Sequence, residues 1–546
     1  MLNLRLRKNK LNTWSILSFI IITLIILPSL NIIIELVSDP TQNWGHIKEY
    51  LLKDYTINSL KLITYTGFLT MIIGTSLAWI ISVYDFPLRN LFKWALILPL
   101  AIPPYVGAYT YNGLLNYTGV IQSSLRNFFN LSLNQKYFDI MGAQGAVFIF
   151  TVLLFPYVFA ITRAFMEKQS ASLIETARTL GRSPLEIFIY VILPISRGAI
   201  VGGVSLVILE VLNDYGLVKY FGIPTFSTAI FKTWFGLGDI NSAVRLSAIL
   251  LLIVFSILGL EKIFRGRKQY SPSTSKIRPI VRYKLEGKKS FFAFSYCLSI
   301  FAVGFLIPAA QLMYWSLISF KHVISFKFLS FVLNSVVSAL IASCLIILFA
   351  VVVANNSRIS QGFASKLNSK IIVLGYSIPG AVIAIGVIVL FLNIDNNFYW
   401  LYQIINPQWP KLLLSTSITM LIFAYVIRFL AIGYNSVEAG FQKVGKKYFE
   451  ASRTLGMNIS QTFIKVDLPM MKTALISGFI LVFVDILKEL PLTLLLRPFN
   501  FETLATKAFE YANDEMIHEA SIASLLIILV SSVSIYFFNM AGEREV

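Results

Sequence analysis

Two pairs of acidic residues interrupt long apolar stretches of the 546-residue sequence. Glu210 and Asp214 form the first pair. Asp485 and Glu489 form the second pair, 275 residues further along the chain. A charged side chain at bilayer depth costs roughly 2.5 to 3.5 kcal/mol, so these carboxylates need a partner, an aqueous path or a function. Residues four apart share a helix face, and we expect both pairs to line a substrate pathway suited to a cation.

Local roles are the alternative for the same carboxylates. Lys488 follows Asp485 by three residues, a spacing that permits an ion pair on one helix face. Asp214 and Glu489 could also stand at the watery ends of their apolar segments. The sequence leaves both interpretations open.

The segment from Gly440 to Lys447 would indicate nucleotide binding if it formed a phosphate-binding loop. It reads Gly-Phe-Gln-Lys-Val-Gly-Lys-Lys and matches the first positions of a phosphate-binding loop. However, Lys447 stands where a Ser or Thr should contact magnesium, and a long apolar segment rather than a strand precedes the motif. The sequence also contains no Gly-x-Ser-x-Gly, His-Glu-x-x-His or Cys-x-x-Cys pattern. We therefore predict that the chain is not an enzyme and binds no metal or other cofactor of its own.

One stretch of sequence occurs twice. Glu175–Gly181 reads Glu-Thr-Ala-Arg-Thr-Leu-Gly, and Glu450–Gly456 reads Glu-Ala-Ser-Arg-Thr-Leu-Gly, at an offset of 275 residues. Each copy continues to a Leu-Pro pair, at Pro194 and at Pro469, just before an apolar segment. Matches at so many positions in register indicate an internal duplication. We predict a helix, a turn at the glycine and a second helix in each copy, with the proline in a first helical turn.

The composition indicates a membrane protein. Hydrophobic residues make up 56% of the chain, charged residues make up 13%, and the mean hydropathy is +0.73. One soluble core cannot bury so much apolar surface. The net charge of +19 comes from Lys and Arg that cluster in short segments between apolar stretches, which is typical of the positive-inside rule. We therefore expect contact with lipid and no nucleic acid partner.

The apolar segments have the length of membrane spans. The first, from about Trp14 to Leu36, is too long for a signal peptide, and no small-x-small cleavage site follows it. We predict an all-α membrane protein of about twelve transmembrane helices. The expected spans lie near 14–36, 59–82, 94–114, 144–165, 195–215, 244–263, 293–318, 331–354, 370–393, 413–433, 472–496 and 519–539. The basic residues favour a multi-pass protein with both termini and both duplicated segments in the cytoplasm.

The spans and the duplication divide the chain into two homologous halves of about six helices each. The first half covers residues 1–265, with the duplicated loop at about 167–197. The second covers 291–546, with its loop at about 437–471. The linker 266–290 is densely basic, so it either contacts anionic lipid or a regulator, or is a solvated tether that fixes the topology.

The duplicated pattern resembles the signature cytoplasmic loop of binding-protein-dependent ABC importer permeases. Thr176 and Ser452 stand where that pattern usually has alanine. The resemblance implies the type I ABC importer permease fold, a plasma-membrane (cell inner membrane) location, an extracytoplasmic substrate-binding protein, and two copies of an ATPase subunit that bind ATP-Mg and dock on the loops. The implied docking positions are Glu175, Ala177, Arg178, Gly181, Pro194, Glu450, Ala451, Arg453, Gly456 and Pro469.

Further segments are similar to the permeases of ferric-iron importers. These are Leu98–Val106, Leu212–Gly216, Tyr220–Phe226, Val426–Leu430, Asn435–Gly440 and Lys488–Thr493. The resemblance implies ferric iron as the cargo, with alternating access driven by ATP. Thiamine, phosphonate, sulfate and polyamine are the alternatives within the same architecture.

A protein of another class, an ATP-independent channel or secondary transporter, is the remaining alternative. Repeats in many such folds are inverted, which requires an odd number of spans in each half. Six spans per half, with both loops on one side, favour the importer.

Overall fold

The computed structural model describes residues 13–131, 134–167, 171–265, 282–359, 368, 370–372 and 375–543. The chain forms two compact units, each built from two separate parts of the sequence. The smaller unit comprises Met1–Ser38 and Leu333–Phe501, and the larger unit comprises Asp39–Val332 and Glu502–Val546. The two strands described, Tyr84–Asp85 (β1) and Tyr283–Lys284 (β2), form a short parallel pair in the larger unit. Most of the predicted basic linker, residues 266–281, lies outside the described residues.

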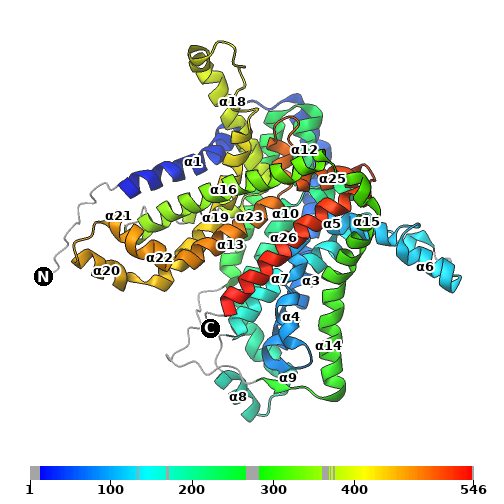
Figure 1. The fold of residues 1–546 in the computed structure, drawn as a ribbon. Coiled ribbons are helices and arrows are strands. Elements are labelled where there is room, and N and C mark those ends of the chain that lie inside the picture. Colours follow the sequence, from blue (N-terminus) through cyan, green and yellow to red (C-terminus); the bar gives the residue numbers. More distant parts are fainter. Residues whose placement is uncertain are drawn as a thin grey trace. The chain divides into compact units, whose positions relative to one another are not determined.

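The smaller unit is helical (Figure 1). Its helices are α1 (Thr13–Glu35), most of α16 (Phe326–Ile359), α18 (Gly380–Ile405), α19 (Ile418–Val444), α20 (Lys446–Thr454), α21 (Ile459–Thr462), the π-helix η7 (Phe463–Asp467), α22 (Leu468–Met470), α23 (Lys472–Leu487) and α24 (Pro491–Leu496). The core lies where α18, α19 and α24 pack together. There the hydroxyl groups of Tyr425 and Thr493, both buried, share a hydrogen bond of 2.6 Å.

The larger unit is built around two of its own long helices, α3 and α7, which pack along each other. Its first elements are α2 (Gln42–His46), the π-helix η1 (Ile47–Leu51), α3 (Leu52–Val83), α4 (Arg89–Ala95), the 3₁₀-helix η2 (Leu98–Ala101), α5 (Pro104–Leu115), α6 (Val120–Phe129), the 3₁₀-helix η3 (Gln135–Tyr137) and α7 (Ala143–Glu167). Next come α8 (Ala171–Thr179), α9 (Pro184–Ile187), the π-helix η4 (Phe188–Ile192), α10 (Leu193–Asn213), α11 (Gly216–Tyr220), α12 (Phe226–Phe231), the π-helix η5 (Lys232–Gly236) and α13 (Ile240–Arg265). The last are α14 (Gly287–Phe301), the π-helix η6 (Ala302–Leu306), α15 (Ile307–Val323), α25 (Leu504–Asn513) and α26 (Ile517–Glu543).

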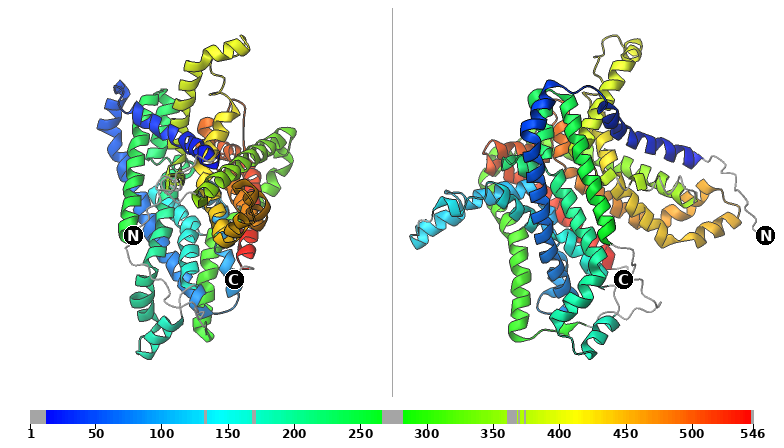
Figure 2. Two further views of the ribbon diagram at one scale, coloured as in Figure 1. Left: turned by 90° about the vertical axis from the view of Figure 1, so that its left-hand side faces the viewer. Right: turned by 180° about the vertical axis from the view of Figure 1, so that it is seen from behind.

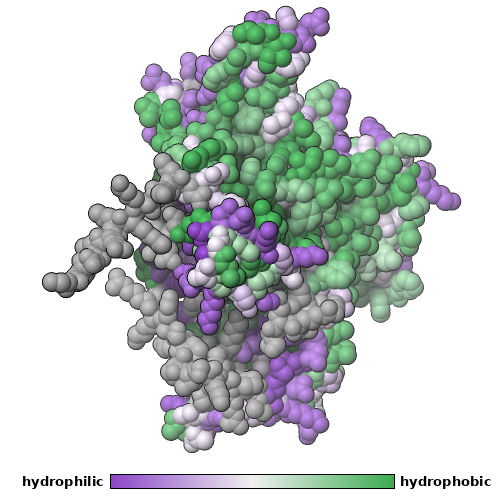
Figure 3. Space-filling view, turned by 60° about the vertical axis from the view of Figure 1, so that its left-hand side comes forward, coloured by the Kyte–Doolittle hydropathy of each residue, from purple (hydrophilic) through white to green (hydrophobic). Residues whose placement is uncertain are grey.

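The prediction of an all-α membrane protein with about twelve spans is confirmed. Within the described ranges, ten helices are long and apolar enough to cross a membrane, or up to twelve if two bent pairs each count as one span. Figure 3 shows hydrophobic residues over much of one face, as expected of a surface that contacts lipid.

Two predicted spans are not straight helices. The span predicted at 94–114 is bent by 92° between Arg89–Ala101 and Pro104–Phe129, because Pro103 and Pro104 interrupt the helical hydrogen bonds. The span predicted at 472–496 is divided into α23 (Lys472–Leu487) and α24 (Pro491–Leu496), and a bend of 75° separates α23 from the preceding Ile459–Met470. The span predicted at 370–393 also lies later, at Gly380–Ile405, because Pro379 directly precedes the first turn of α18.

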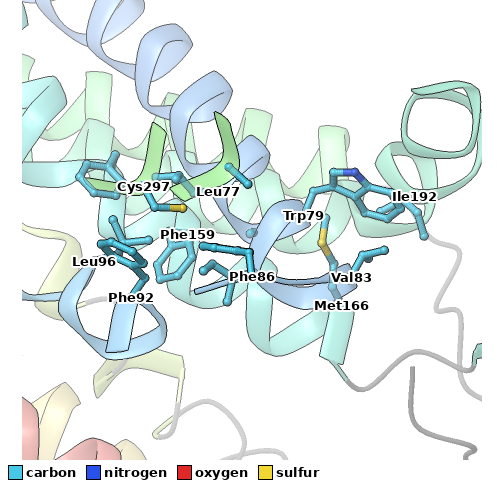
Figure 4. Packing of buried hydrophobic residues seen from close by; sticks show 14 of the residues in the cluster. Leu77, Trp79, Val83, Phe86, Phe92, Leu96, Phe159, Met166, Ile192 and Cys297 are labelled. Atoms are coloured by element: carbon cyan, nitrogen blue, oxygen red, sulfur yellow. The ribbon is translucent and has the colours of Figure 1, made fainter. Parts of the chain in front are cut away.

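The compact units cut across the two sequence halves, because the first span of each half packs with elements of the other half. Helix α1 packs on α18 in the smaller unit. Helix α14 contributes Cys297 to the hydrophobic cluster of the larger unit, beside Phe92 and Phe159 (Figure 4). The halves 1–265 and 291–546 thus remain a prediction about the sequence repeat, and they do not coincide with the compact units.

The α1–α18 contact depends on a glycine. A Cβ atom on Gly386 of α18 would lie 2.7 Å from the carbonyl oxygen of Pro28 in α1. That oxygen belongs to a backbone that cannot move without moving the helix. The absence of a side chain at Gly386 therefore lets the two helices approach closely.

We predict that Gly386→Ala destabilises the protein by about 1 to 3 kcal/mol, because the added methyl group overpacks the α1–α18 contact. The midpoint temperature of unfolding of the purified protein in detergent measures this effect. Gly259→Ala in α13 is the matched control, since nothing lies within 4 Å of its Cβ position. Equal midpoints for the two variants would show that α1 does not depend on this close approach.

Candidate functional site

The first duplicated loop, from α8 to Pro194, turns at Gly181. Helix α8 ends in a Schellman motif, in which the Gly181 N–H donates to the Arg178 carbonyl at 2.8 Å and the Arg182 N–H donates to the Ala177 carbonyl at 3.1 Å. The φ angle of Gly181 is +79°, which lies in the left-handed region. A residue with a Cβ atom adopts this region only with strain, so glycine suits the position.

A second helix begins directly after this turn. Ser183 and Glu186 form a capping box at the start of α9, with the Ser183 N–H donating to the Glu186 carboxylate at 2.8 Å. Helix α9 continues through η4 into α10, where Pro194 occupies the first turn as expected. The whole stretch Pro184–Asn213 qualifies as one candidate span. The loop is thus joined to a membrane span without a helical break.

The second duplicated loop, from α20 to Pro469, repeats the same backbone design. Gly456 has a φ angle of +86° and ends α20 with two hydrogen bonds of 3.2 Å in the same Schellman pattern. Asn458 and Gln461 form the equivalent capping box, with distances of 2.8 and 2.9 Å. A π-helical segment, η7, and Pro469 in a first turn follow. The predicted helix, turn and helix is therefore present in both copies.

Each turn presents an exposed leucine. Leu180 is 76% exposed and Leu455, its equivalent at the offset of 275 residues, is 80% exposed. Because the exposed leucine recurs at the equivalent position of both loops, we add Leu180 and Leu455 to the candidate site. Neither leucine is among the predicted docking positions, although the presence of leucine at this position in both copies was a signal in the sequence.

The two copies bury their small residue at equivalent positions. Ala177 is buried in the first loop, and its equivalent, Ser452, is buried in the second. The Ser452 hydroxyl lies 2.8 Å from the Thr462 hydroxyl and donates to the Phe449 carbonyl at 2.8 Å. Ala451, which the sequence pattern singled out, is exposed. In the second loop, Ser452 thus takes the internal packing position and Ala451 lies on the surface.

The other predicted loop positions lie at or near the surface. Glu175 is half-buried, and Glu450 is exposed. Pro194 and Pro469 are both exposed in their first turns. Of the two acidic residues at the start of the pattern, Glu450 therefore lies on the loop surface and Glu175 is partly covered.

The arginines of the pattern contact the chain itself. The Arg178 guanidinium lies over the Tyr283 ring, 3.3 Å from its centroid. Burial raises the pKa of the neighbouring Tyr84 phenol, and the positive charge of Arg178 partly opposes this rise. Arg453 donates a hydrogen bond to the Met457 carbonyl across its own turn. Both arginines therefore help to hold their loops.

A buried ion pair anchors the second loop. An Arg358 Nη atom of α16 lies 2.7 Å from the Asp467 carboxylate at the end of η7, with the side chains 8% and 0% exposed. Arg358 also donates to the Gly445 carbonyl at 2.8 Å and lies over the Phe441 and Phe449 rings. The second loop is thus tied to α16 by charge.

Apolar packing takes the place of this ion pair in the first loop. The equivalent of Asp467 is Ile192, which is buried in a hydrophobic cluster with Trp79 and Val83 of α3 (Figure 4). The same backbone is therefore anchored to its neighbouring span by two different interactions.

The second acidic pair forms ion pairs in the smaller unit. Lys488 Nζ lies 2.7 Å from the Asp485 carboxylate, and both side chains are about a quarter exposed, at 26% and 23%. Glu489 is buried, and its Oε2 atom lies 3.3 Å from Nε of Arg428, which is also buried. The Asp485–Lys488 contact is the local pair that the sequence left open, whereas Glu489 pairs with a distant residue of the sequence and is buried rather than at a watery end.

Asp214 and Glu489 share a role in the backbone. Asp214 Oδ1 accepts a hydrogen bond of 2.9 Å from the Leu217 N–H at the start of α11. Glu489 Oε1 accepts one of 3.2 Å from the Leu492 N–H at the start of α24. Both carboxylates thus satisfy N–H groups of the short helix that follows, at equivalent places in the repeat. Glu210 lies half-buried on α10, one turn before Asp214, in the larger unit.

The segment Gly440–Lys447 is not a phosphate-binding loop. Gly440 lies inside α19, where a Cβ atom would be 2.9 Å from Ala474 Cβ, and Gly445 separates α19 from α20. A phosphate-binding loop directly follows a strand, whereas this segment begins inside helix α19. Across the described ranges, no group of three or more His, Cys, Asp or Glu side chains could hold a metal ion.

Comparison with known proteins identifies a family match over more than half of the chain. Residues 70–267 and 346–546 each match the family model described as "Binding-protein-dependent transport system inner membrane component". Each matched region contains one of the two loops. The duplication inferred from the sequence is therefore matched by two copies of one family domain.

Individual relatives are distant. The chain is 25% identical to the "Fe(3+)-transport system permease protein FbpB 2" of Haemophilus influenzae, over 86% of each chain. It is 24% identical to the "Putative ferric transport system permease protein FbpB 1" of the same species, over 80% of this chain and 69% of the relative. The "Sulfate transport system permease protein CysT" of Salmonella typhimurium is 26% identical over 37% of this chain and 72% of the relative.

We predict that Asp467→Leu lowers the stability of the protein by about 3 to 5 kcal/mol, because it leaves the buried Arg358 guanidinium without its counter-charge. The double variant Arg358→Met/Asp467→Leu should recover most of this loss, since apolar pairs often replace buried ion pairs at little cost. Midpoint temperatures of unfolding in detergent measure both effects.

Ile192→Asp in the first loop is the matched control. It places a carboxylate at the equivalent buried position without an arginine and should also destabilise the protein. Equal losses for the single and double variants in the second loop would contradict the assignment of the ion pair as the anchor.

Proposed function

Because the chain belongs to the family of binding-protein-dependent transport system inner membrane components, and is therefore the permease of an ABC importer, we propose that ferric iron is its cargo and that its two equivalent loops are docking sites for the ATPase. As a member of this family it is a multi-pass inner membrane protein that works with a substrate-binding protein and an ATPase, and it hydrolyses no ATP itself.

The repeated loop geometry is the observation that supports ATPase docking. Gly181 and Gly456 make the same turn, the same type of capped helix follows each, and Leu180 and Leu455 are exposed at the same position. Two equivalent surfaces on one chain suit two copies of one ATPase subunit. The exposed leucines would enter apolar pockets of that partner, and the exposed polar residues would form the rim of the contact.

Coupling follows from the connection of each loop to a span. A helix transmits a displacement along its axis because its backbone hydrogen bonds keep its length constant. In the first loop, the helical path runs without interruption from Pro184 to Asn213. In the second loop, the path bends by 75° near Met471 before it continues as α23. We propose that ATP-driven motion of the partner is delivered to the spans along these two paths and produces alternating access.

The proposed docking sites define an orientation. The ATPase acts in the cytoplasm, so both loops lie on the cytoplasmic side. The distribution of Lys and Arg over the predicted spans favours the same arrangement and places both termini in the cytoplasm. The substrate-binding protein then acts on the opposite side of the membrane. ATP and magnesium stay with the partner ATPase.

The names of the relatives support ferric iron as cargo. Two relatives named as ferric permeases match this chain across 80% or more of its length, and the sulfate permease matches 37% of this chain and 72% of its own length. A passage with carboxylates suits a hard cation. We keep four carboxylates as the candidate pathway residues: Glu210, Asp214, Asp485 and Glu489. The competing role for three of them is structural, because Asp485 and Glu489 form ion pairs and Asp214 caps a helix. Sulfate is the second candidate cargo, because one of the three relatives described above is named as a sulfate permease. None of the three is named for thiamine, phosphonate or polyamine.

We predict that the double variant Gly181→Val/Gly456→Val loses most ATP-driven import while the chain still enters the membrane. Nothing lies within 4 Å of either Cβ position, so the substitution acts on the backbone alone, where a left-handed non-glycine residue costs about 1 to 2 kcal/mol. A β-branched residue should shift the turn and displace the docking helix. Import by proteoliposomes with the purified ATPase and binding protein measures the loss.

Gly238→Val is the matched control for this double variant. Gly238 also has a positive φ, of +62°, and nothing within 4 Å of its Cβ position, but it lies outside both loops. The control should retain import. Full import by the double variant would contradict the docking assignment, and Asn in place of Val should restore function because Asn tolerates the left-handed region better.

We predict that cells lacking this chain, and lacking other iron routes, lose accumulation of radiolabelled ferric iron during iron starvation. The intact chain should restore accumulation, and the double glycine variant should not. Unchanged iron accumulation together with lost sulfate accumulation would overturn ferric iron as the cargo in favour of sulfate.

A further inference from the structure

The first loop rests against an indole ring from its own half. Phe188, the first residue of η4, lies 5.4 Å from Trp79 between ring centroids. Trp79 is a buried residue of α3 and belongs to the hydrophobic cluster that also contains Ile192 (Figure 4). The π-helical part of the first loop is thus held by a tryptophan on the adjacent span.

The second loop lacks this tryptophan on its adjacent span. The equivalent of Phe188 is Phe463, and the span equivalent to α3 is α16. In the register that aligns Asn58-Ser59 with Asn334-Ser335, the position of Trp79 is taken by Asn355. The buried residues of α3 and α16 follow this register closely.

Asn355 does not replace the indole chemically. Its side chain is fully buried, and among the described residues neither amide atom has a hydrogen-bond partner. A buried amide without partners is costly, so it is a poor support for a neighbouring aromatic ring.

A tryptophan from the other half of the chain contacts the second loop instead. Trp14, near the start of α1, lies edge-on to Phe463 with 5.2 Å between the ring centroids. Its indole N–H donates to the Ser460 hydroxyl of α21 at 3.1 Å. Both contacts lie within the smaller unit.

A second contact places this end of α1 beside α16. The Ser15 hydroxyl donates to the Asn356 side-chain oxygen at 2.8 Å. Figures 1 and 2 show α1 running along α16 in the same unit, with the second loop near the same end of both helices. The start of α1, the end of α16 and the second loop therefore meet at one place.

We propose that Trp14 supplies to the second loop the indole that Trp79 supplies to the first, so that the first span of the chain is a working part of the second loop. Trp14 is a positioning residue in this proposal, because it acts through Phe463 and Ser460. The proposal rests on the docking function proposed above, and it adds that the second docking site is assembled from both halves of the chain.

The first loop shows a comparable contact, which is independent of Trp14. Arg178 lies over Tyr283, a residue of β2 that pairs with Tyr84 of β1 just before α14 begins. The segment that leads into the first span of the second half thus contacts the first loop. Each loop is therefore contacted by a residue from outside its own half.

Spin-label mobility in the full permease tests the proposal. The label is attached at Leu180→Cys or Leu455→Cys, one exposed site on each loop, with Cys297 and Cys344 replaced by alanine. Trp14→Ala should raise mobility at the second loop alone, and Trp79→Ala should raise it at the first loop alone. Trp14→Phe should stay near the unmodified protein, because it keeps the aromatic contact.

Phe19→Ala is the matched control on α1, because Phe19 is an aromatic residue that is 67% exposed. It should change mobility at neither loop. Equal effects of Trp14→Ala on both loops, or an effect on neither, would overturn the proposal.

Retention of the ATPase separates this proposal from the proposed function. If the loops are docking sites, Trp14→Ala should weaken binding of the ATPase to the permease about two- to tenfold, the range expected for loss of one aromatic pair. A selective rise in mobility at the second loop without weaker binding would support the positioning by Trp14 and contradict the docking function. Weaker binding without a change in loop mobility would contradict the positioning by Trp14.

Discussion

A glycine in the left-handed region lets each loop reverse direction and re-enter the membrane as a helix. Gly181 and Gly456 end one helix, and the N-cap residue of the next helix lies two residues later. Each turn pairs carbonyl groups at the end of the first helix, and each capping box pairs N–H groups at the start of the next. With the backbone satisfied in this way, the remaining loop surface is free to present Leu180 and Leu455 to a partner. The ATPase docking that we propose depends on this local geometry.

The two loops share a backbone but are held to their spans by different forces. Apolar packing around Ile192 and Trp79 anchors the first loop. Charge between Arg358 and Asp467 anchors the second, together with the indole of Trp14. After the duplication, the two copies could change these contacts independently, provided that the docking surface itself stayed the same. The protein is therefore symmetric in its proposed docking surface and asymmetric in its supports.

The sequence predicted those features that depend on neighbouring residues. The apolar segments indicated the spans, and the Leu-Gly and Leu-Pro pairs indicated the turns and helix starts. It did not predict the contacts between distant segments, such as Trp14 with Phe463 or Arg358 with Asp467, because these depend on how spans pack. Pro103 and Pro104 are visible in the sequence, but the 92° angle of the bend is not, because two prolines interrupt a helix without fixing the angle between its parts. The pathway role of the acidic residues remains a prediction; Asp485 pairs with the nearby Lys488, and Glu489 pairs with Arg428 on another helix.

The distance between the two loops during the ATP cycle tests the central claim most directly. Spin labels at Leu180→Cys and Leu455→Cys would report this distance by pulsed electron resonance in the complex with the ATPase. If both loops are docking sites, the distance distribution should shift between the nucleotide-free and ATP-bound complexes, and should return after hydrolysis. An identical distribution in all nucleotide states, in a complex shown to import its cargo, would contradict the claim that these loops receive the motion of the ATPase.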